Sequence, residues 1–128
     1  MIVILDASAL LSVIFEERGA ERVTEMIEAS VIGTANFCEV MTKIVDQGLD
    51  AGIALGLIDR LNIRVVDFDR SQAEAAAYLR IATRSAGLSL GDRACLALAA
   101  SLDGVALTCD QAWARLPADI GIKVELAR

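Results

Sequence analysis

The segment IVILD, residues 2–6, places an aspartate directly after a short run of aliphatic, mostly β-branched residues. Such a run is typical of a buried strand, and the apolar spacing of residues 7–15 predicts a helix after it. Further strands are predicted at 31–34, 63–66, 105–108 and 122–126. Helices are predicted at about 20–29, 35–47, 51–61, 71–86, 89–102 and 110–116. Strands that alternate with helices predict an α/β sandwich with a parallel sheet covered on both faces.

Composition narrows the class of protein. A chain of 128 residues is long enough for one domain, residues 1–128, with its own core. Apolar residues make up 55% and aromatic residues 4%, and this aliphatic excess favours a subunit interface, so a homodimer is expected. No apolar segment of about 18 residues is free of charges, so no membrane span is expected. The apolar start lacks a basic leader, and three cysteines without CxxC spacing favour a reduced, cytoplasmic protein.

The chain has no histidine, which excludes catalytic triads and the usual zinc hydrolase ligand sets. Any hydrolysis must therefore use carboxylates, metals, lysine, arginine or hydroxyls. The net charge of −6 argues against binding to nucleic acid, because phosphate contacts dominate such affinity. A cluster of acids filled by a metal ion would change the local field, however, so the net charge does not decide the matter.

Four acids stand near strand ends or in the first turns of predicted helices. Asp6 and Asp110 follow two predicted strands, Glu39 lies in the helix that leaves another strand, and Asp92 begins the helix that leads to the fourth strand. If the first and fourth strands are neighbours, Asp6 and Asp110 flank the crevice at the carboxyl edge of the sheet, where ligands bind. Carboxylates crowded there repel one another unless a cation lies between them. Oxygen ligands of this kind suit Mg²⁺ or Mn²⁺.

Each acid also has a purely structural explanation. Asp6 and Asp110 can cap helices by accepting backbone N–H bonds. Asp92 follows Ser89 at the spacing of a capping box, and Glu39 has the same relation to Asn36. Glu39 is also one helical turn from Lys43, at the spacing of a weak ion pair. The helix-capping and metal-binding interpretations both remain open at this point.

Four strings of the sequence together resemble the motifs of PIN domains, most of all the VapC-type toxins of toxin–antitoxin pairs. The strings are VILDASALLSV (3–13), ANFCEV (35–40), LSLGDRACLALA (88–99) and ALTCDQAW (106–113). The resemblance implies a three-layer α/β/α fold with a five-stranded parallel sheet. It also implies a Mg²⁺- or Mn²⁺-dependent endoribonuclease, which a cognate antitoxin inhibits by laying a segment, often with an arginine, across the site. Homodimers are common in this family.

Residue by residue, the resemblance maps the acidic quartet of the family onto Asp6, Glu39, Asp92 and Asp110. Ser8 and Thr108 fall where the family often has polar side chains that support the site. Many relatives have an acid or amide two residues after the last aspartate. Here that position is Ala112, which argues against tight binding of a second metal ion.

We expect Asp6 and Asp110 to be direct metal ligands and Asp92 to complete the ligand set. Glu39, with its longer side chain, is expected to orient or deprotonate the attacking water. Arg80, Arg84, Arg93 and Arg115 are expected mainly to be solvated surface charges, and the alternative is a rim of arginines that binds RNA phosphates. Trp113 is expected in the core, and the three cysteines are expected to be small buried packing residues.

Two alternatives are open. The first is a catalytically silent PIN fold that only binds protein or RNA, which the intact quartet argues against. The second is an aspartyl-phosphate phosphotransferase of the haloacid dehalogenase type, which also uses an aspartate after its first strand. That family needs a second aspartate where this chain has Ser8, and a lysine for which Lys43 and Lys123 are poorly placed.

Overall fold

The computed structural model describes all 128 residues, and its centre is a parallel sheet of five strands. The strands are β1 (Val3–Leu5), β2 (Ser30–Gly33), β3 (Arg64–Val66), β4 (Val105–Thr108) and β5 (Lys123–Leu126). Their order is β3-β2-β1-β4-β5, and β1 pairs in parallel with β2 on one side and with β4 on the other. Four of the strands end at the predicted residue, and β2 ends one residue earlier, at Gly33, because Thr34 already begins a helix.

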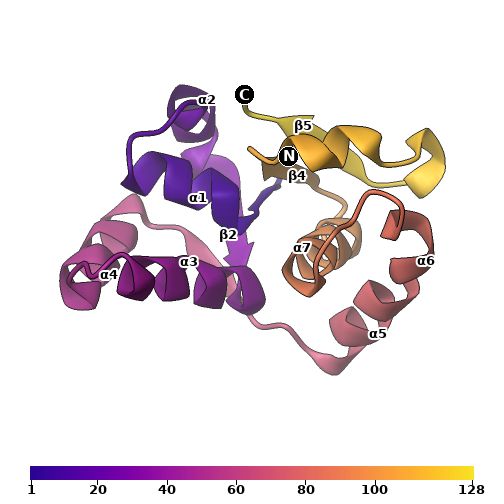
Figure 1. The fold of residues 1–128 in the computed structure, drawn as a ribbon, viewed down its shortest axis with the longest axis horizontal. Coiled ribbons are helices and arrows are strands. Elements are labelled where there is room, and N and C mark those ends of the chain that lie inside the picture. The colour runs from indigo at the N-terminus through magenta and orange to yellow at the C-terminus, as the bar shows by residue number, and fades with distance from the viewer.

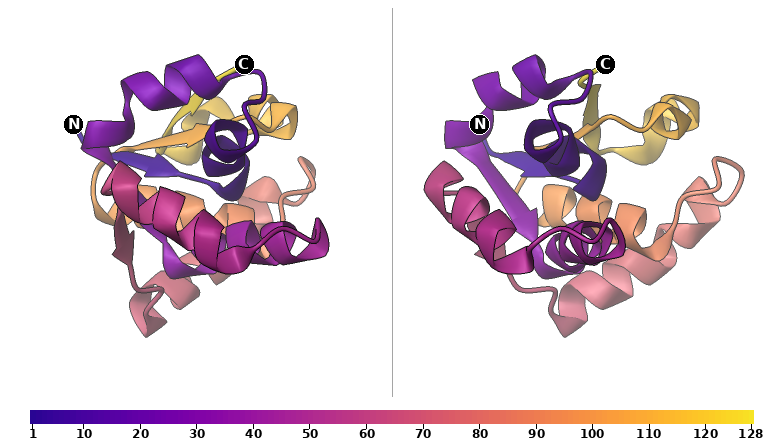
Figure 2. Two further views of the ribbon diagram at one scale, coloured as in Figure 1. Left: turned by 90° about the vertical axis from the view of Figure 1, so that its left-hand side faces the viewer. Right: turned by 60° about the vertical axis from the view of Figure 1, so that its left-hand side comes forward.

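Helices connect the strands and cover both faces of the sheet (Figures 1 and 2). The α-helices are α1 (Ala7–Ile14), α2 (Ala20–Glu25), α3 (Thr34–Asp46), α4 (Ala51–Leu61), α5 (Arg70–Tyr78), α6 (Arg80–Thr83) and α7 (Leu90–Ser101). Three short 3₁₀ helices are η1 (Ile27–Ala29), η2 (Gln111–Arg115) and η3 (Ala118–Ile120). None of these helices is both long enough and apolar enough to span a lipid bilayer.

The side chains of β1 divide the core into two layers. Val3 and Leu5 point to one face, where they pack with α1 to α4, and Ile4 points to the other face. There it meets α7 and η2, with α5 packed on the outer side of α7. Neighbouring side chains of a strand point to opposite faces of the sheet, so the three residues of β1 contribute to the cores on both faces. The three-layer α/β/α prediction is therefore confirmed (Figure 1).

Two predicted helices end earlier than the apolar pattern indicated. The helix predicted at 71–86 is interrupted at Leu79, between α5 and α6, and ends at Thr83, whose hydroxyl donates to the Leu79 carbonyl at 2.8 Å. A hydroxyl that bonds back one turn often bends a helix. The helix predicted at 20–29 likewise ends as α2 at Glu25 and continues as the 3₁₀ turn η1.

The order of the strands creates a switch point beside β1. The chain goes from β1 outward to β2 and β3, then returns to place β4 on the other side of β1. Connections that leave in opposite directions open a crevice at the carboxyl ends of the two central strands. The condition on which the predicted site depends, that the first and fourth strands are neighbours, is met.

Candidate functional site

Asp6 lies at the switch point, between the ends of β1 and β4. It caps α1, and its Oδ1 accepts hydrogen bonds of 2.8 Å from the Ala9 amide and the Ser8 hydroxyl. Its Oδ2 accepts a short bond from the Thr108 hydroxyl. Both hydroxyls are oriented by the turn after β4, because Ser8 Oγ accepts from the amide of residue 109 at 2.9 Å and Thr108 Oγ1 accepts from the Asp110 amide at 3.0 Å. Ser8 and Thr108 therefore hold the Asp6 carboxylate in one orientation.

Asp6 is only 3% exposed, and the burial of this residue has an electrostatic consequence. Desolvation raises the pKa of Asp6 to about 6, although the bonds from Thr108, Ala9 and Ser8 act in the opposite direction. The negative charge of Asp92 adds to the increase. A carboxylate kept in a desolvated site near a second carboxylate is a common feature of functional sites.

Glu39 reaches the same region from α3 through a contact with α7. The buried Asn36 amide donates 3.0 Å bonds to Glu39 Oε1 and to the Gly91 carbonyl oxygen. The chemistry fixes the orientation of this amide, because a flipped Asn36 would place its oxygen against two acceptors. Desolvation raises the pKa of Glu39, the Asn36 bond lowers it, and the charge of Asp92 raises it further. Asn36 thus joins the motif of Glu39 to the motif of Asp92.

Gly91 leaves the space that the Glu39 carboxylate occupies. A Cβ atom at position 91 would lie 2.5 Å from Cδ of Glu39, so the Glu39 carboxylate would have to move. The end of this exposed side chain can move at little cost, and alanine is the better helix former by roughly 0.5–1 kcal/mol. Gly91→Ala therefore displaces one acid without changing the charge of the site.

We expect Gly91→Ala to lower the catalytic activity of this site by about 10–100-fold, because Glu39 loses its position, with the melting temperature unchanged or raised. Reaction rates and thermal unfolding of the purified variant measure both effects. The matched control is Gly56→Ala in α4, where an added Cβ meets no atom within 4 Å. Equal activity of the two variants would show that the position of Glu39 does not matter.

Asp92 and Asp110 both make the capping contacts that the structural explanation predicts. Asp92 Oδ2 accepts from the Ser89 amide at 2.9 Å while its own amide donates to Ser89 Oγ at 3.2 Å, forming a capping box. Asp110 Oδ1 accepts from the Ala112 amide at 2.9 Å. The pairing of Glu39 with Lys43 does not form, and no lysine or arginine lies within 4 Å of any of the four acids. Helix capping thus explains one oxygen of the Asp92 carboxylate and one of the Asp110 carboxylate, but no cationic side chain neutralises the negative charges of the four acids.

The donor chemistry of these acids fits a hard divalent cation. Carboxylate oxygens are its preferred ligands, and one oxygen on each of Glu39, Asp92 and Asp110 makes no hydrogen bond. The side chains as they lie do not gather three ligands around one point, so binding requires rotation of carboxylates. Asp6, Asp92 and Glu39 are linked by mutual repulsion, and Asp110 joins them through its amide bond to Thr108.

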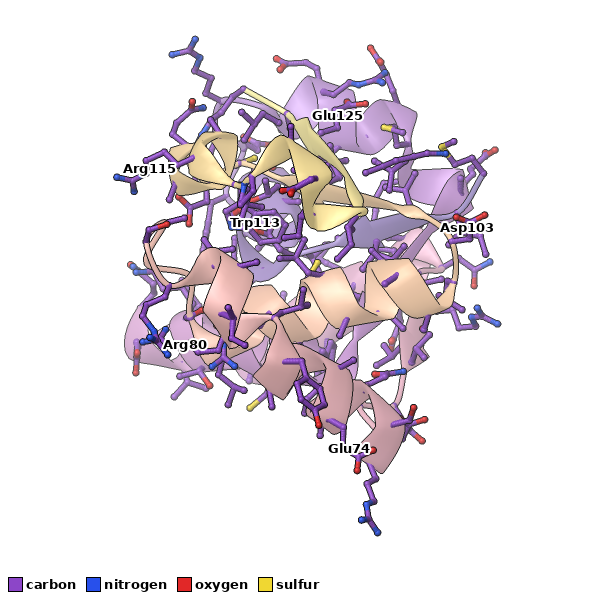
Figure 3. The ribbon with its side chains drawn as sticks, turned by 90° about the vertical axis from the view of Figure 1, so that its right-hand side faces the viewer. Glu74, Arg80, Asp103, Trp113, Arg115 and Glu125 are labelled. Carbon is purple, nitrogen blue, oxygen red and sulfur yellow. The ribbon has the colours of Figure 1, made fainter.

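Some residues lie where the sequence did not place them. Cys38 is exposed, so its prediction as a buried packing residue is wrong, whereas Cys95 and Cys109 are buried. Trp113, a residue of η2, is buried in the core cluster that includes α7, as predicted (Figure 3). The role of Asn36 was missed, because α3 already begins at Thr34 and Asn36 faces inward rather than capping it. Its spacing of three residues from Glu39, on one helix face, was the available signal.

The fold and the site define a class of protein: α/β proteins with an acidic site at the switch point of a five-stranded parallel sheet. Comparison of the sequence with known families identifies the family within this class. The chain belongs to the PIN domain family, which it matches over residues 3–119. Nucleases with this domain generally use divalent metal ions. A search of curated protein sequences finds no match.

Solved structures with a similar fold include complexes of toxins with antitoxins. DNA-bound VapBC from Salmonella typhimurium has a TM-score of 0.74 at 18% identity and covers 100% of this chain and 99% of that chain. VapBC2 from Rickettsia felis, bound to a fragment of promoter DNA, has a TM-score of 0.74 at 14% identity and covers 98% of each chain. A toxin–antitoxin complex from Klebsiella pneumoniae has a TM-score of 0.69 at 19% identity, again covering 98% of each chain. At these identities the similarity shows a common fold.

Proposed function

We propose that this protein is a metal-dependent endoribonuclease, the toxin of a toxin–antitoxin pair, with Mg²⁺ or Mn²⁺ as its cofactor. The observation that carries the proposal is the group of acids around Asp6. Asp6 is desolvated, the charge of Asp92 repels both Asp6 and Glu39, and no lysine or arginine lies within 4 Å of the group. Membership in the PIN family and the similarity to the toxin–antitoxin complexes support the same conclusion.

The proposed chemistry divides between the cation and the side chains. A divalent cation bound here would supply an acidified water and positive charge for the scissile phosphate. Asp6, Asp92 and Asp110 would hold it, with Ser8 and Thr108 keeping Asp6 in place. Glu39 has a free Oε2 and a raised pKa, which suits it to accept the proton of the attacking water.

Arginines near the site provide contacts for an acidic chain to bind RNA. Arg80 and Arg115 lie on the side of the molecule where α7 begins, opposite Asp103 at its end (Figure 3). Asp92 lies in the first turn of α7, so these arginines are on the side of the candidate site. Arg80 and Arg93 each donate to a backbone carbonyl, of Leu88 at 3.4 Å and of Ala76 at 3.0 Å, but Arg93 is less suitable because its Nε is buried. One guanidinium group can donate two parallel hydrogen bonds to two oxygens of a phosphate, so arginines near the site would strengthen RNA binding.

The proposed protein partners follow from charge and apolar surface. A basic antitoxin segment, with an arginine directed at the acids, would neutralise the site of an enzyme with a net charge of −6. A homodimer would cover apolar side chains such as Tyr78 and Ile81, which are 77% and 80% exposed. Sedimentation of the purified protein would measure the oligomeric state directly.

Cleavage of RNA with and without metal tests the function. We expect the purified protein to cut single-stranded RNA in Mn²⁺ or Mg²⁺ and to stop in EDTA. Millimolar Mn²⁺ should also raise the melting temperature by about 5–10 °C, because binding to the folded state alone stabilises it by mass action. RNA binding without cleavage at any metal concentration would instead indicate a catalytically silent PIN fold.

The phosphotransferase alternative is disfavoured by the structure. Ser8, which stands where that chemistry needs a second aspartate, donates a hydrogen bond to Asp6. Lys123 begins β5 and therefore lies at the amino edge of the sheet, opposite Asp6. Lys43 belongs to the last turn of α3 and is exposed. The chain thus places no lysine where it could stabilise an aspartyl phosphate.

A further inference from the structure

We infer that a polar pocket beside Asp110, lined by Arg18, Gln111 and Arg128, binds a phosphate of the RNA next to the scissile one. This inference rests on the proposed function and adds a second contact point for the same substrate. The pocket has a volume of about 490 Å³ and no apolar residue in its lining. Its chemistry is that of an anion site because two guanidinium groups line it, while the Gln111 amide donates to the Arg128 backbone oxygen at 2.5 Å.

The pocket forms where the end of the chain returns to the site. The amide of Ala127 donates to the Thr108 carbonyl at 2.8 Å, which places Arg128 beside the turn after β4. Arg128 Nε then donates to the Cys109 carbonyl at 3.2 Å, and its Nη1 donates to the Arg18 carbonyl at 3.0 Å. Figure 2 shows the C-terminus next to the connection between α1 and α2, which contains Arg18. The Arg128 guanidinium is therefore held in place by two carbonyls rather than free in solvent.

Neither guanidinium in the pocket has an acidic partner. The side chains of Arg18 and Arg128 have no carboxylate within 4 Å, and that of Arg18 makes no hydrogen bond. The nearby Arg22 is different, because Glu25 and Glu125 bind it at 2.9 and 2.5 Å. Most lysines and arginines of the chain lack a carboxylate partner, but Arg18 and Arg128 are distinguished by lining one hollow together. Such groups are best satisfied by an external anion.

The position of the pocket indicates which anion it serves. Gln111 follows Asp110 directly, and Arg128 bonds to the carbonyl of the residue before Asp110. The turn that carries Asp110 therefore also carries Gln111 and holds the Arg128 guanidinium beside the pocket. A nucleic acid strand that reached Asp6 would continue past this turn, with its next phosphate facing the guanidinium groups. The acids Glu16 and Glu17 line a separate hollow with α2 and do not enter the pocket.

A contact with phosphate alone predicts affinity without sequence selectivity. The occupant is therefore the sugar–phosphate backbone of single-stranded RNA rather than a particular base. Arg18 is the residue to test, because its side chain supports no other part of the fold, whereas Arg128 also links two loops. Arg64 is the matched control: it is exposed, has no carboxylate partner and begins β3 at the opposite edge of the sheet.

The experiment measures binding and cleavage separately. Fluorescence anisotropy with a mixed-sequence single-stranded RNA of about 12 nucleotides, in EDTA, gives affinity and its salt dependence. We expect Arg18→Ala to weaken binding by about tenfold and to reduce the slope of log affinity against log salt by about 0.7. In Mn²⁺ the same variant should raise KM by a similar factor with kcat nearly unchanged. Arg64→Ala should change none of these values.

The outcomes separate this inference from the proposed function. If Arg18→Ala and Arg64→Ala behave alike while wild-type protein cuts RNA, the pocket assignment is overturned and the nuclease stands. If the wild type binds RNA through Arg18 but does not cut it, the assignment of the pocket to RNA phosphate is supported and the proposed nuclease activity is overturned. A wild type that does not bind RNA at all overturns the pocket. If Arg18→Ala weakens binding to a protein partner but keeps the RNA affinity of the wild type, the assignment of the pocket to RNA is also overturned.

Discussion

Replacement of Asp6 by asparagine is expected to abolish RNA cleavage, by about a thousandfold or more, and to stabilise the folded protein at neutral pH. Cleavage is lost because an amide cannot replace a carboxylate as ligand of a divalent cation. Stability rises because the variant no longer keeps a charge in a site that is 3% exposed and faces Asp92. Asparagine caps helices as well as aspartate does, so the start of α1 is retained.

The pH dependence of this effect has a definite sign. Asp6 has an ordinary pKa of 3.8 and a pKa of about 6 in the folded protein. Between these values the folded state binds more protons than the unfolded state, so stability is lost as pH rises. The difference corresponds to about 3 kcal/mol, present below pH 3.8 and lost above pH 6. Asparagine does not ionise, so the variant does not lose this stability as pH rises. Its unfolding free energy should match that of the wild type near pH 3.5 and exceed it by about 1–3 kcal/mol at pH 7.5.

Urea unfolding in EDTA across this pH range measures the prediction, and RNA cleavage in Mn²⁺ measures the loss of activity. The control is Asp69→Asn, at an exposed cap of α5 whose carboxylate accepts only the Gln72 amide, at 2.8 Å. It should leave cleavage unchanged. An Asp6 variant that unfolds more easily than wild type at neutral pH would mean that Asp6 serves the fold as a cap.

Much of the fold could be predicted from the sequence, because its signals are local. A β-branched run ending in Asp6 determines the strand and the start of α1 without reference to distant residues. The break at Leu79 could not be read in this way. Helical periodicity continues through it, and the bend depends on the Thr83 hydroxyl bonding one turn back in a buried position.

The candidate site shows the same division between local and distant information. The acids could be selected because motifs near strand ends place them at one edge of a parallel sheet. Asn36 and Gly91 are 55 residues apart, and the bond between them depends on how α3 packs against α7. The position of Arg128 depends on the pairing of β5 with β4 and on two backbone carbonyls. Local patterns do not contain such contacts.

Asp92 gives the sharpest separation between helix capping and catalysis, because its capping partner can be changed independently. In Asp92→Asn, the amide oxygen can still accept the bond from the Ser89 amide, so the start of α7 is preserved. The loss of a negative charge at a helix N-terminus costs about 0.3–1 kcal/mol, and relief of repulsion with Asp6 and Glu39 offsets part of it. We expect a nearly unchanged melting temperature and a loss of cleavage of about a thousandfold or more.

Ser89→Ala makes the opposite change. It removes the hydroxyl that accepts the Asp92 amide at 3.2 Å and costs about 1 kcal/mol of stability, but it leaves the Asp92 carboxylate and its bond from the amide of residue 89. Cleavage by this variant should remain within about threefold of wild type, since a lost cap of this size does not unfold the protein. Cleavage rates in Mn²⁺ and melting temperatures should therefore rank the two variants in opposite orders. Ser89→Ala should be the less stable but active variant, and Asp92→Asn the stable but inactive one. If instead activity falls in step with stability in both, Asp92 acts only through the start of α7, and the acidic site loses a member.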